Sequence, residues 1–251
     1  MQLVPHQPAS RPAEYVLADW SYRSAPERMA FLRSVVEDAA QDTRIRAFAV
    51  AIVSAHGFVA RDYENHARLL LEWVQGNIKY VPEEGEILQD PRKTLELGFG
   101  DCDDQVLLLA TLFASVGLPY RFVLAGHAPV RSPWRAAKTA QPVRWVEGTR
   151  CPVADWKHIY LAVGWPVHDP RHWAWADPSE KDAPLGWDVF TGPLRQRNFA
   201  LAGTEDGAAA PATPGIPEWT SIARDIFLYA SAGVISAVVS TLILDALKHR
   251  R

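Results

Sequence analysis

The segment Gly98 to Gln105 places a cysteine between a glycine-rich bend and a long apolar run, and this pattern constrains the fold more than any other in the chain. The apolar run extends from Val106 to Val116. Asp101 suits an N-cap, because its carboxylate can accept hydrogen bonds from the amides of a following first turn. The pattern therefore predicts a buried helix that begins near Cys102 and ends before Gly117-Leu118-Pro119.

A cysteine in the first turn of a helix can act as a nucleophile. The partial positive charge of the helix N-terminus favours the thiolate, which is the nucleophilic form. The backbone amide of Cys102 could also bind a developing oxyanion at this helix start. Three neighbouring aspartates, at positions 101, 103 and 104, act in the opposite direction, because their negative charge raises the pKa of a thiol.

A nucleophilic cysteine also needs a base and a group that orients the base. His158 begins a strand-like run that ends at Val163, and Asp177 ends a second such run that begins at Trp173. If the two runs pair as neighbouring antiparallel strands, these side chains can meet at one end of a sheet. His158 would then take the proton from Cys102, and Asp177 would hold the imidazole in the useful tautomer.

The order of these motifs resembles the transglutaminase-like branch of the papain-like superfamily. The resemblance covers Tyr63 to Asp188, and it suggests a bacterial or phage-encoded member. The matching segments are Gly-Asp-Cys-Asp-Asp, His-Ile-Tyr and Trp-Ala-Asp-Pro, with Leu71 to Val74, Asn77 to Pro82, Gln89 to Pro91 and Thr94 to Leu95 upstream.

This resemblance implies an α+β fold in which the helix that bears the cysteine packs on an antiparallel sheet that bears the histidine and the aspartate. It implies a catalytic triad of Cys102, His158 and Asp177. The implied chemistry is acyl transfer from an amide to water or to an amine through a thioester. No cofactor and no metal are expected.

Two further residues are candidates for contact with the substrate or the oxyanion. Gln89 could donate to the oxyanion, as a glutamine does in papain-like enzymes, although it lies well before Cys102 in the sequence. Trp175 lies two residues before Asp177 and would share its strand face. We expect most of the ten tryptophans to pack in the core or on the sheet.

A long polar insert, Gly126 to Lys157, separates the first predicted strand from His158. Because long loops are usually functional or disordered, we expect a lid, a specificity loop or a docking surface beside the cleft. Cys151 lies in this insert, and both cysteines are expected to be free thiols. His168 and His172 have the spacing of a helical zinc site, but the proline between them favours a surface loop.

The chain divides into a core and terminal appendages. We expect an extended N-terminal arm over residues 1–24, a catalytic domain over 25–200, a linker rich in Ala, Gly and Pro over 201–217, and a hydrophobic helix over 218–251. Apolar spacing predicts helices over 25–40, 44–54 and 62–78. A net charge of −3 gives no electrostatic footprint for nucleic acid.

The segment Ile226 to Leu244 contains no charged residue. A helix of about 20 apolar residues matches the hydrocarbon core of a bilayer, so this segment could be a membrane anchor. Its stripe of small residues, Gly233, Ala237 and Thr241, would equally suit a helix buried against copies of the chain or other partners. No secretory signal is visible at the N-terminus, so we expect the catalytic domain to be cytoplasmic, unless the protein is assembled into a virion.

The leading hypothesis is a cysteine-dependent amide hydrolase or acyltransferase, with a peptidase favoured and a protein or peptide as the substrate. The alternative is a structural component of a phage virion or a membrane complex that retains the fold. In that case the terminal arms would make the assembly contacts.

Overall fold

The computed structural model describes residues 14–16, 23–55, 59–82, 87–128 and 142–190. Its elements in chain order are β1 (Glu14–Val16), α1 (Ala25–Ala39), α2 (Thr43–Ser54), α3 (Tyr63–Asn77), β2 (Lys79–Tyr80), β3 (Ile87–Gln89), α4 (Pro91–Leu97), β4 (Phe99–Gly100), α5 (Cys102–Ser115), β5 (Tyr120–His127), β6 (Pro142–Val146), β7 (Asp155–Trp165) and β8 (His172–Ala176). The predicted combination of helices with an antiparallel sheet is confirmed.

The main sheet has four strands in the order β6-β5-β7-β8, and every neighbouring pair is antiparallel. Strands β7 and β8 pair with Leu161 opposite Ala176 and Val163 opposite Ala174. The predicted pairing of the strand that begins near His158 with the strand that ends before Asp177 is therefore confirmed. This register places both side chains at one end of the sheet.

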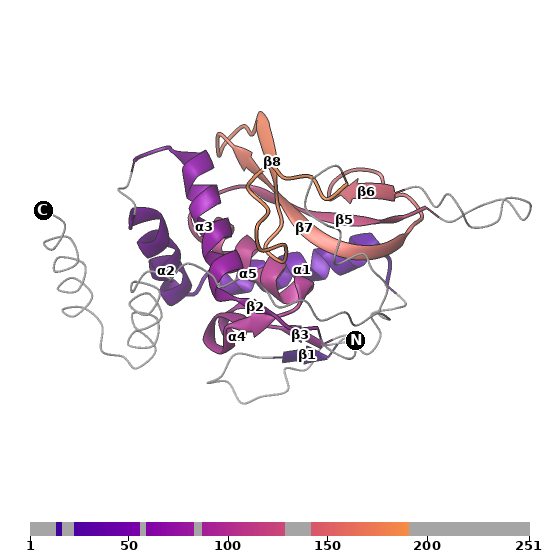
Figure 1. Cartoon of the computed structure of the whole chain (residues 1–251), viewed down its shortest axis with the longest axis horizontal. Coiled ribbons are helices and arrows are strands. Elements are labelled where there is room, and N and C mark those ends of the chain that lie inside the picture. The colour runs from indigo at the N-terminus through magenta and orange to yellow at the C-terminus, as the bar shows by residue number, and fades with distance from the viewer. Residues whose placement is uncertain (1–13, 17–22, 56–58, 83–86, 129–141, 191–251) are drawn as a thin grey trace, which may run out of the picture.

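Helix α5 is the centre of the hydrophobic core. Its residues are apolar on every side, so the helix is buried all round, and Leu107, Leu108 and Leu109 have no exposed surface. The helix packs against α1, α2, α3, α4 and β7. Figure 1 shows α5 in the middle of the molecule, with the four-stranded sheet on one side and α4 with the short strands on the other.

The two faces of the sheet have different neighbours. On β7, Ile159, Leu161 and Val163 belong to the main core with α5. Tyr160 lies on the opposite face, in a second cluster with Val189 and other apolar residues of the sheet. The alternation of a strand thus directs Ile159, Leu161 and Val163 toward α5 and Tyr160 toward the other face.

The three helices predicted before the bend are confirmed, with bounds within one or two residues of the apolar spacing. Local capping explains where the first two begin. At α1 the side chain and backbone amide of Ser24 both donate to Glu27, as in a capping box. At α2 the carboxylate of Asp42 accepts from the amide of Arg44.

The interpretation of 126–157 as one long insert is corrected by the structure. Gly126 and His127 continue β5, residues 142–146 form the edge strand β6, and β7 already begins at Asp155. Valine and tryptophan favour strands, and Pro142 is tolerated because it is the first residue of an edge strand. Residues 129–141 lie outside the described residues, so a lid or docking role for them stays a prediction.

Gly126 itself is required by this arrangement. A β-bulge shifts the register of β5 and β7 between Ala125 and Gly126. A Cβ atom at Gly126 would lie only 2.1 Å from the carbonyl oxygen of Asp155, so any side chain there would force the two strands apart.

Within the predicted N-terminal arm the structure describes β1, which pairs antiparallel with β3, with Glu14 opposite Gln89. The predicted linker and the apolar segment Ile226 to Leu244 lie outside the described residues, so the anchor and the assembly helix both stay predictions. None of the helices in the described ranges combines the length and the apolar character needed to cross a bilayer.

Candidate active site

The bend before α5 forms as the sequence predicts. Helix α4 ends at Leu97, and its C-cap Gly98 has a φ of 73°, the left-handed conformation that glycine tolerates. Strand β4 then pairs in parallel with β2, so that Gly100 lies opposite Tyr80. Asp101 is the N-cap of α5, and its carboxylate accepts from the amides of Asp103 at 3.0 Å and Asp104 at 3.4 Å. Cys102 is the first residue of the helix.

Asp104 is a buried carboxylate whose hydrogen bonds stabilise the bend. It accepts hydrogen bonds from the backbone amide of Gln89 at 2.8 Å, from the side-chain amide of Gln89 at 3.0 Å, and from the backbone amide of Asp101 at 3.3 Å. Burial, with a further contribution from Asp101, raises the pKa of Asp104 to about 6. A Cβ atom at Gly100 would lie 2.6 Å from the Cβ of Asp104, so this approach requires glycine.

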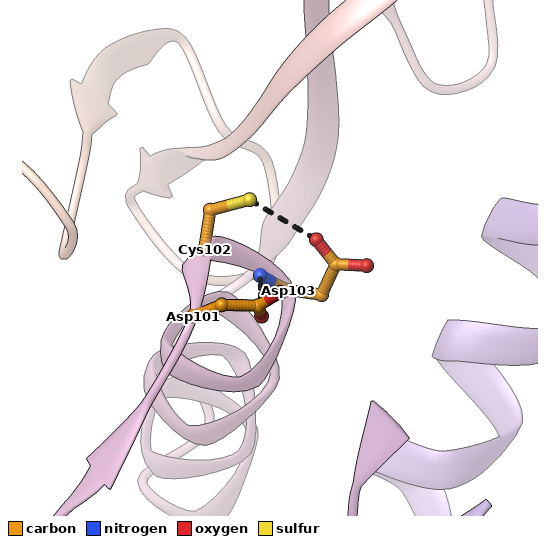
Figure 2. Close-up of side chains that lie close together, drawn as sticks. All are labelled: Asp101, Cys102 and Asp103. Carbon is orange, nitrogen blue, oxygen red and sulfur yellow. Dashed lines mark hydrogen bonds between the residues drawn. The ribbon is translucent and has the colours of Figure 1, made fainter. Parts of the chain in front are cut away.

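The thiol of Cys102 donates a hydrogen bond to the carboxylate of Asp103, with 3.1 Å between the sulfur and Oδ1 (Figure 2). Burial raises the pKa of the Cys102 thiol well above its usual value, and the charges of Asp103 and Asp101 raise it further. After burial, the charges of Asp103 and Asp101 thus act on the thiol in the direction that the sequence predicts. In this arrangement the thiol keeps its proton.

His158 and Asp177 form a buried pair. Nε2 of His158 lies 2.7 Å from Oδ2 of Asp177, and the exposed fractions of the two side chains are 4% and 2%. Burial alone would lower the pKa of His158, but Asp177 raises it above the usual value. Burial alone would raise the pKa of Asp177, but His158 and Ser179 lower it. Both shifts favour an imidazolium-carboxylate pair.

The other oxygen of Asp177 is also bound. Oδ1 accepts from the backbone amide of Ser179 at 3.1 Å and from its hydroxyl at 2.8 Å. The carboxylate is thus held from both sides, and it presents a single oxygen to the imidazole. Asp177 directly follows β8, and His158 lies on β7, so the antiparallel pairing of these strands creates the contact.

The cysteine and the histidine-aspartate pair lie within electrostatic reach of one another. The charge of Asp177 contributes to the raised pKa of Cys102, and the charge of Asp103 contributes to the raised pKa of His158. Helix α5 packs against β7, which brings the two parts of the site together. Three segments that are far apart in the sequence therefore lie within range of one another's charges.

The two residues predicted to contact the substrate or the oxyanion have other partners in the structure. Gln89 is buried, and its side-chain amide donates to Asp104, which supports a role in fixing the bend. Trp175 packs edge-on against Tyr160, and the guanidinium of Arg144 lies 4.3 Å from the centre of its ring. These contacts support packing roles, and the substrate and oxyanion roles of both residues stay predictions.

Sequence reasoning did not assign two residues that the structure places at the site. Tyr80 lies opposite Gly100 in the β2-β4 pair, and burial followed by the charge of Cys102 raises the pKa of its hydroxyl to about 12. Its position depends on a parallel pairing that no local pattern reveals. Ser179 had a local signal, because a serine two residues after an aspartate can close a turn onto its carboxylate.

Asp101, Cys102 and Asp103 each offer a potential metal-ligand atom, and these atoms lie within 4.8 Å of one another. The carboxylate of Asp101 already caps the helix, and the thiol is the candidate nucleophile. The cluster therefore has a complete explanation without a metal. Cys151, the other cysteine, is also a free thiol, and it packs against the main core.

Comparison with known proteins places this site in a family. The family model described as the transglutaminase-like superfamily matches residues 47–178. No curated protein matches the chain. A crystal structure of a protein from Parabacteroides distasonis, described as a "putative protease", is similar to the chain with 12% sequence identity and a TM-score of 0.39.

The similar region covers 63% of this chain and 30% of that protein, so the chain spans less than a third of its length. The match to the family model covers all three residues of the predicted triad. It includes the bend, Cys102, strands β7 and β8, and Asp177. Since this match extends over more than half of the 251 residues, the chain belongs to the transglutaminase-like superfamily.

Proposed function

We propose that the protein is a cysteine-dependent amide hydrolase in which Cys102 is the nucleophile, His158 the base and Asp177 the group that orients the base. The observation that supports this most strongly is the buried contact between His158 and Asp177, beside a helix whose first residue is a cysteine. The substrate class that we propose is an unfolded protein or a peptide.

We assign a different role to each ring nitrogen of His158. When neutral His158 donates from Nε2 to Asp177, its Nδ1 has the lone pair that can accept the thiol proton. The sulfur of Cys102 attacks the carbonyl carbon while its proton moves to Nδ1. The tetrahedral intermediate then collapses, and the leaving amine takes the proton from His158, which leaves a thioester on Cys102.

Hydrolysis completes the cycle. His158 takes a proton from water, the resulting hydroxide attacks the thioester carbonyl, and the thiolate leaves and regains the proton. The backbone amide of Cys102 lies in the first turn of α5 and has no acceptor within the helix. We assign it to the oxyanion of both tetrahedral intermediates.

Asp103 makes attack by a preformed thiolate unfavourable. Because its carboxylate accepts from the thiol and raises the pKa of Cys102, proton transfer to His158 must accompany attack on the carbonyl. Binding of a substrate at the sulfur would also have to break the contact between Cys102 and Asp103.

The variant Asp103→Asn is therefore expected to speed the alkylation of Cys102. Removal of the negative charge lowers the pKa of the thiol, and each unit of pKa increases the thiolate fraction about tenfold well below the pKa. We expect iodoacetamide at pH 7 to label Cys102 roughly ten times faster in the variant, as measured by peptide mass spectrometry. Cys151 is the internal reference and should keep its rate. An unchanged or slower rate at Cys102 would show that Asp103 does not control the thiol.

The reaction itself is tested with an unfolded protein substrate and a fluorescent primary amine in the same assay. We expect the whole chain to generate new N-termini in casein, with little incorporation of the amine. Incorporation of the amine without new N-termini would replace hydrolysis by cross-linking transfer. If neither product forms and Cys102 also fails to react with an activated ester, the proposal of an enzyme is wrong.

A further inference from the structure

Gln75 binds the chain segment that follows β8. It lies near the end of α3, and only 9% of its surface is exposed. Its side-chain nitrogen donates to three backbone carbonyl oxygens, those of Asp177 at 2.8 Å, Glu180 at 2.9 Å and Ala183 at 2.9 Å. Because the amide has two hydrogens, at least one of them is shared between acceptors. Residues 177–183 thus curl around a single side-chain amide.

This segment contains both carboxylates that follow β8 and act on the imidazole. Asp177 makes the direct contact with Nε2 of His158, and the charge of Glu180 also contributes to the raised pKa of His158. Gln75 binds the backbone carbonyl of each of these two residues. The position of the negative charge around His158 therefore depends on a helix that contributes no group to the proposed triad.

We propose that Gln75 is a positioning residue that acts on His158 through Asp177. It holds the backbone of 177–183 so that the carboxylate of Asp177 stays on Nε2 of the imidazole. This inference rests on the proposed role of His158 as the base, but the contact can be tested without turnover. Ser179 binds the carboxylate of Asp177 directly. Gln75 therefore fixes the backbone of the turn, and Ser179 orients the carboxylate of Asp177 relative to that backbone.

The structure indicates what the loss of Gln75 does. Buried carbonyl groups without a donor are unfavourable, so the segment 177–183 would move to regain hydrogen bonds from water or from other groups. Movement of Asp177 away from Nε2 removes the interaction that raises the pKa of His158. The pKa of His158 should therefore fall when Gln75 is replaced, because burial then dominates.

The test measures the pKa of His158 by NMR in the whole chain, with histidine labelled with nitrogen-15 and the resonance assigned by comparison with His158→Gln. The variant Gln75→Met keeps the length of the side chain and removes both donors. We expect it to lower the pKa of His158 by about one unit, the scale of effect of a nearby charge. Gln75→Asn keeps the amide on a shorter side chain, and we expect a smaller fall in the same direction.

The matched control is Asn77→Leu. Asn77 lies on the same helix, and its amide donates at 2.7 Å to a backbone carbonyl of that helix, the one of Trp73. We expect no change in the pKa of His158. In the Asp177→Asn background, Gln75→Met should have a smaller effect than in the wild type, because only the contribution of Glu180 to the pKa of His158 then remains.

The proposal is overturned if folded Gln75→Met and Gln75→Asn leave the pKa of His158 unchanged, or if the fall in the Asp177→Asn background is as large as in the wild type. If Gln75→Met does not fold, the Gln75→Asn comparison decides alone. None of these measurements uses substrate. Failure of the hydrolase proposal would be visible as a Cys102 that does not react, whatever the pKa of His158.

Discussion

The variant Cys102→Ala is expected to lose amide cleavage completely while it keeps its fold. Removal of the attacking atom prevents formation of the thioester, and loss of the nucleophile from a catalytic triad lowers the rate by a factor on the order of 10⁴ or more. The side chain is small and packs at the edge of the main core, so the melting temperature should change little. New N-termini in casein measure the activity, and circular dichroism measures the fold.

Cys151→Ala is the matched control for this experiment. It also removes a partly buried free thiol that packs against the main core, but one to which the proposed chemistry gives no role. We expect full activity. Persistent cleavage in Cys102→Ala, or loss of cleavage in Cys151→Ala, would contradict the assignment of Cys102 as the nucleophile.

The second large effect is expected at the base. His158→Gln should lower the rate on the order of 10³-fold, because general base catalysis by a positioned histidine contributes about 10² to 10⁴. Glutamine is preferable to alanine here, because it can still donate to Oδ2 of Asp177 and does not leave that buried oxygen without a donor. The matched control is His172→Gln on the neighbouring strand β8, which should keep the wild-type rate.

Asp177→Asn should cost less than His158→Gln and should also change the pH dependence. Asp177 raises the pKa of His158, so the neutral base is available only above that raised value. Without the carboxylate the pKa falls, and the acid limb of the rate profile should move to lower pH. The profile of Cys102 acylation between pH 5 and 9 measures this shift. A limb that stays in place or moves to higher pH would exclude Asp177 as the partner of the base.

The parts of the site that the sequence predicts are those encoded within a few residues. Asp101, the first turn and the apolar run follow one another directly, so capping and burial of α5 could be predicted from a single window. The runs that begin at His158 and end at Asp177 are equally local, and the antiparallel pairing on which their contact depends is present in the structure. The family resemblance then supplied the link between the cysteine and the two strands.

The remaining features depend on contacts between distant segments or on side-chain directions. The sequence shows three aspartates around Cys102, but only the fold shows that Asp103 faces the sulfur while Asp104 turns inward to Gln89. The hydrogen bond from Gln75 to the carbonyl of Asp177 connects residues that are 102 positions apart in the sequence, and no local pattern predicts it. The composition of 126–157 does not reveal β6, because this edge strand is short and only partly buried.

The most direct test of the central claim is to find where an acyl group attaches to the protein. The whole chain is treated briefly with p-nitrophenyl acetate, and peptide mass spectrometry locates the acetyl group in the wild type and in His158→Gln. The account predicts acetyl on Cys102 with a much slower rate in the variant, and only background labelling of Cys151. Equal labelling of the two cysteines, or a rate at Cys102 that does not depend on His158, would contradict it.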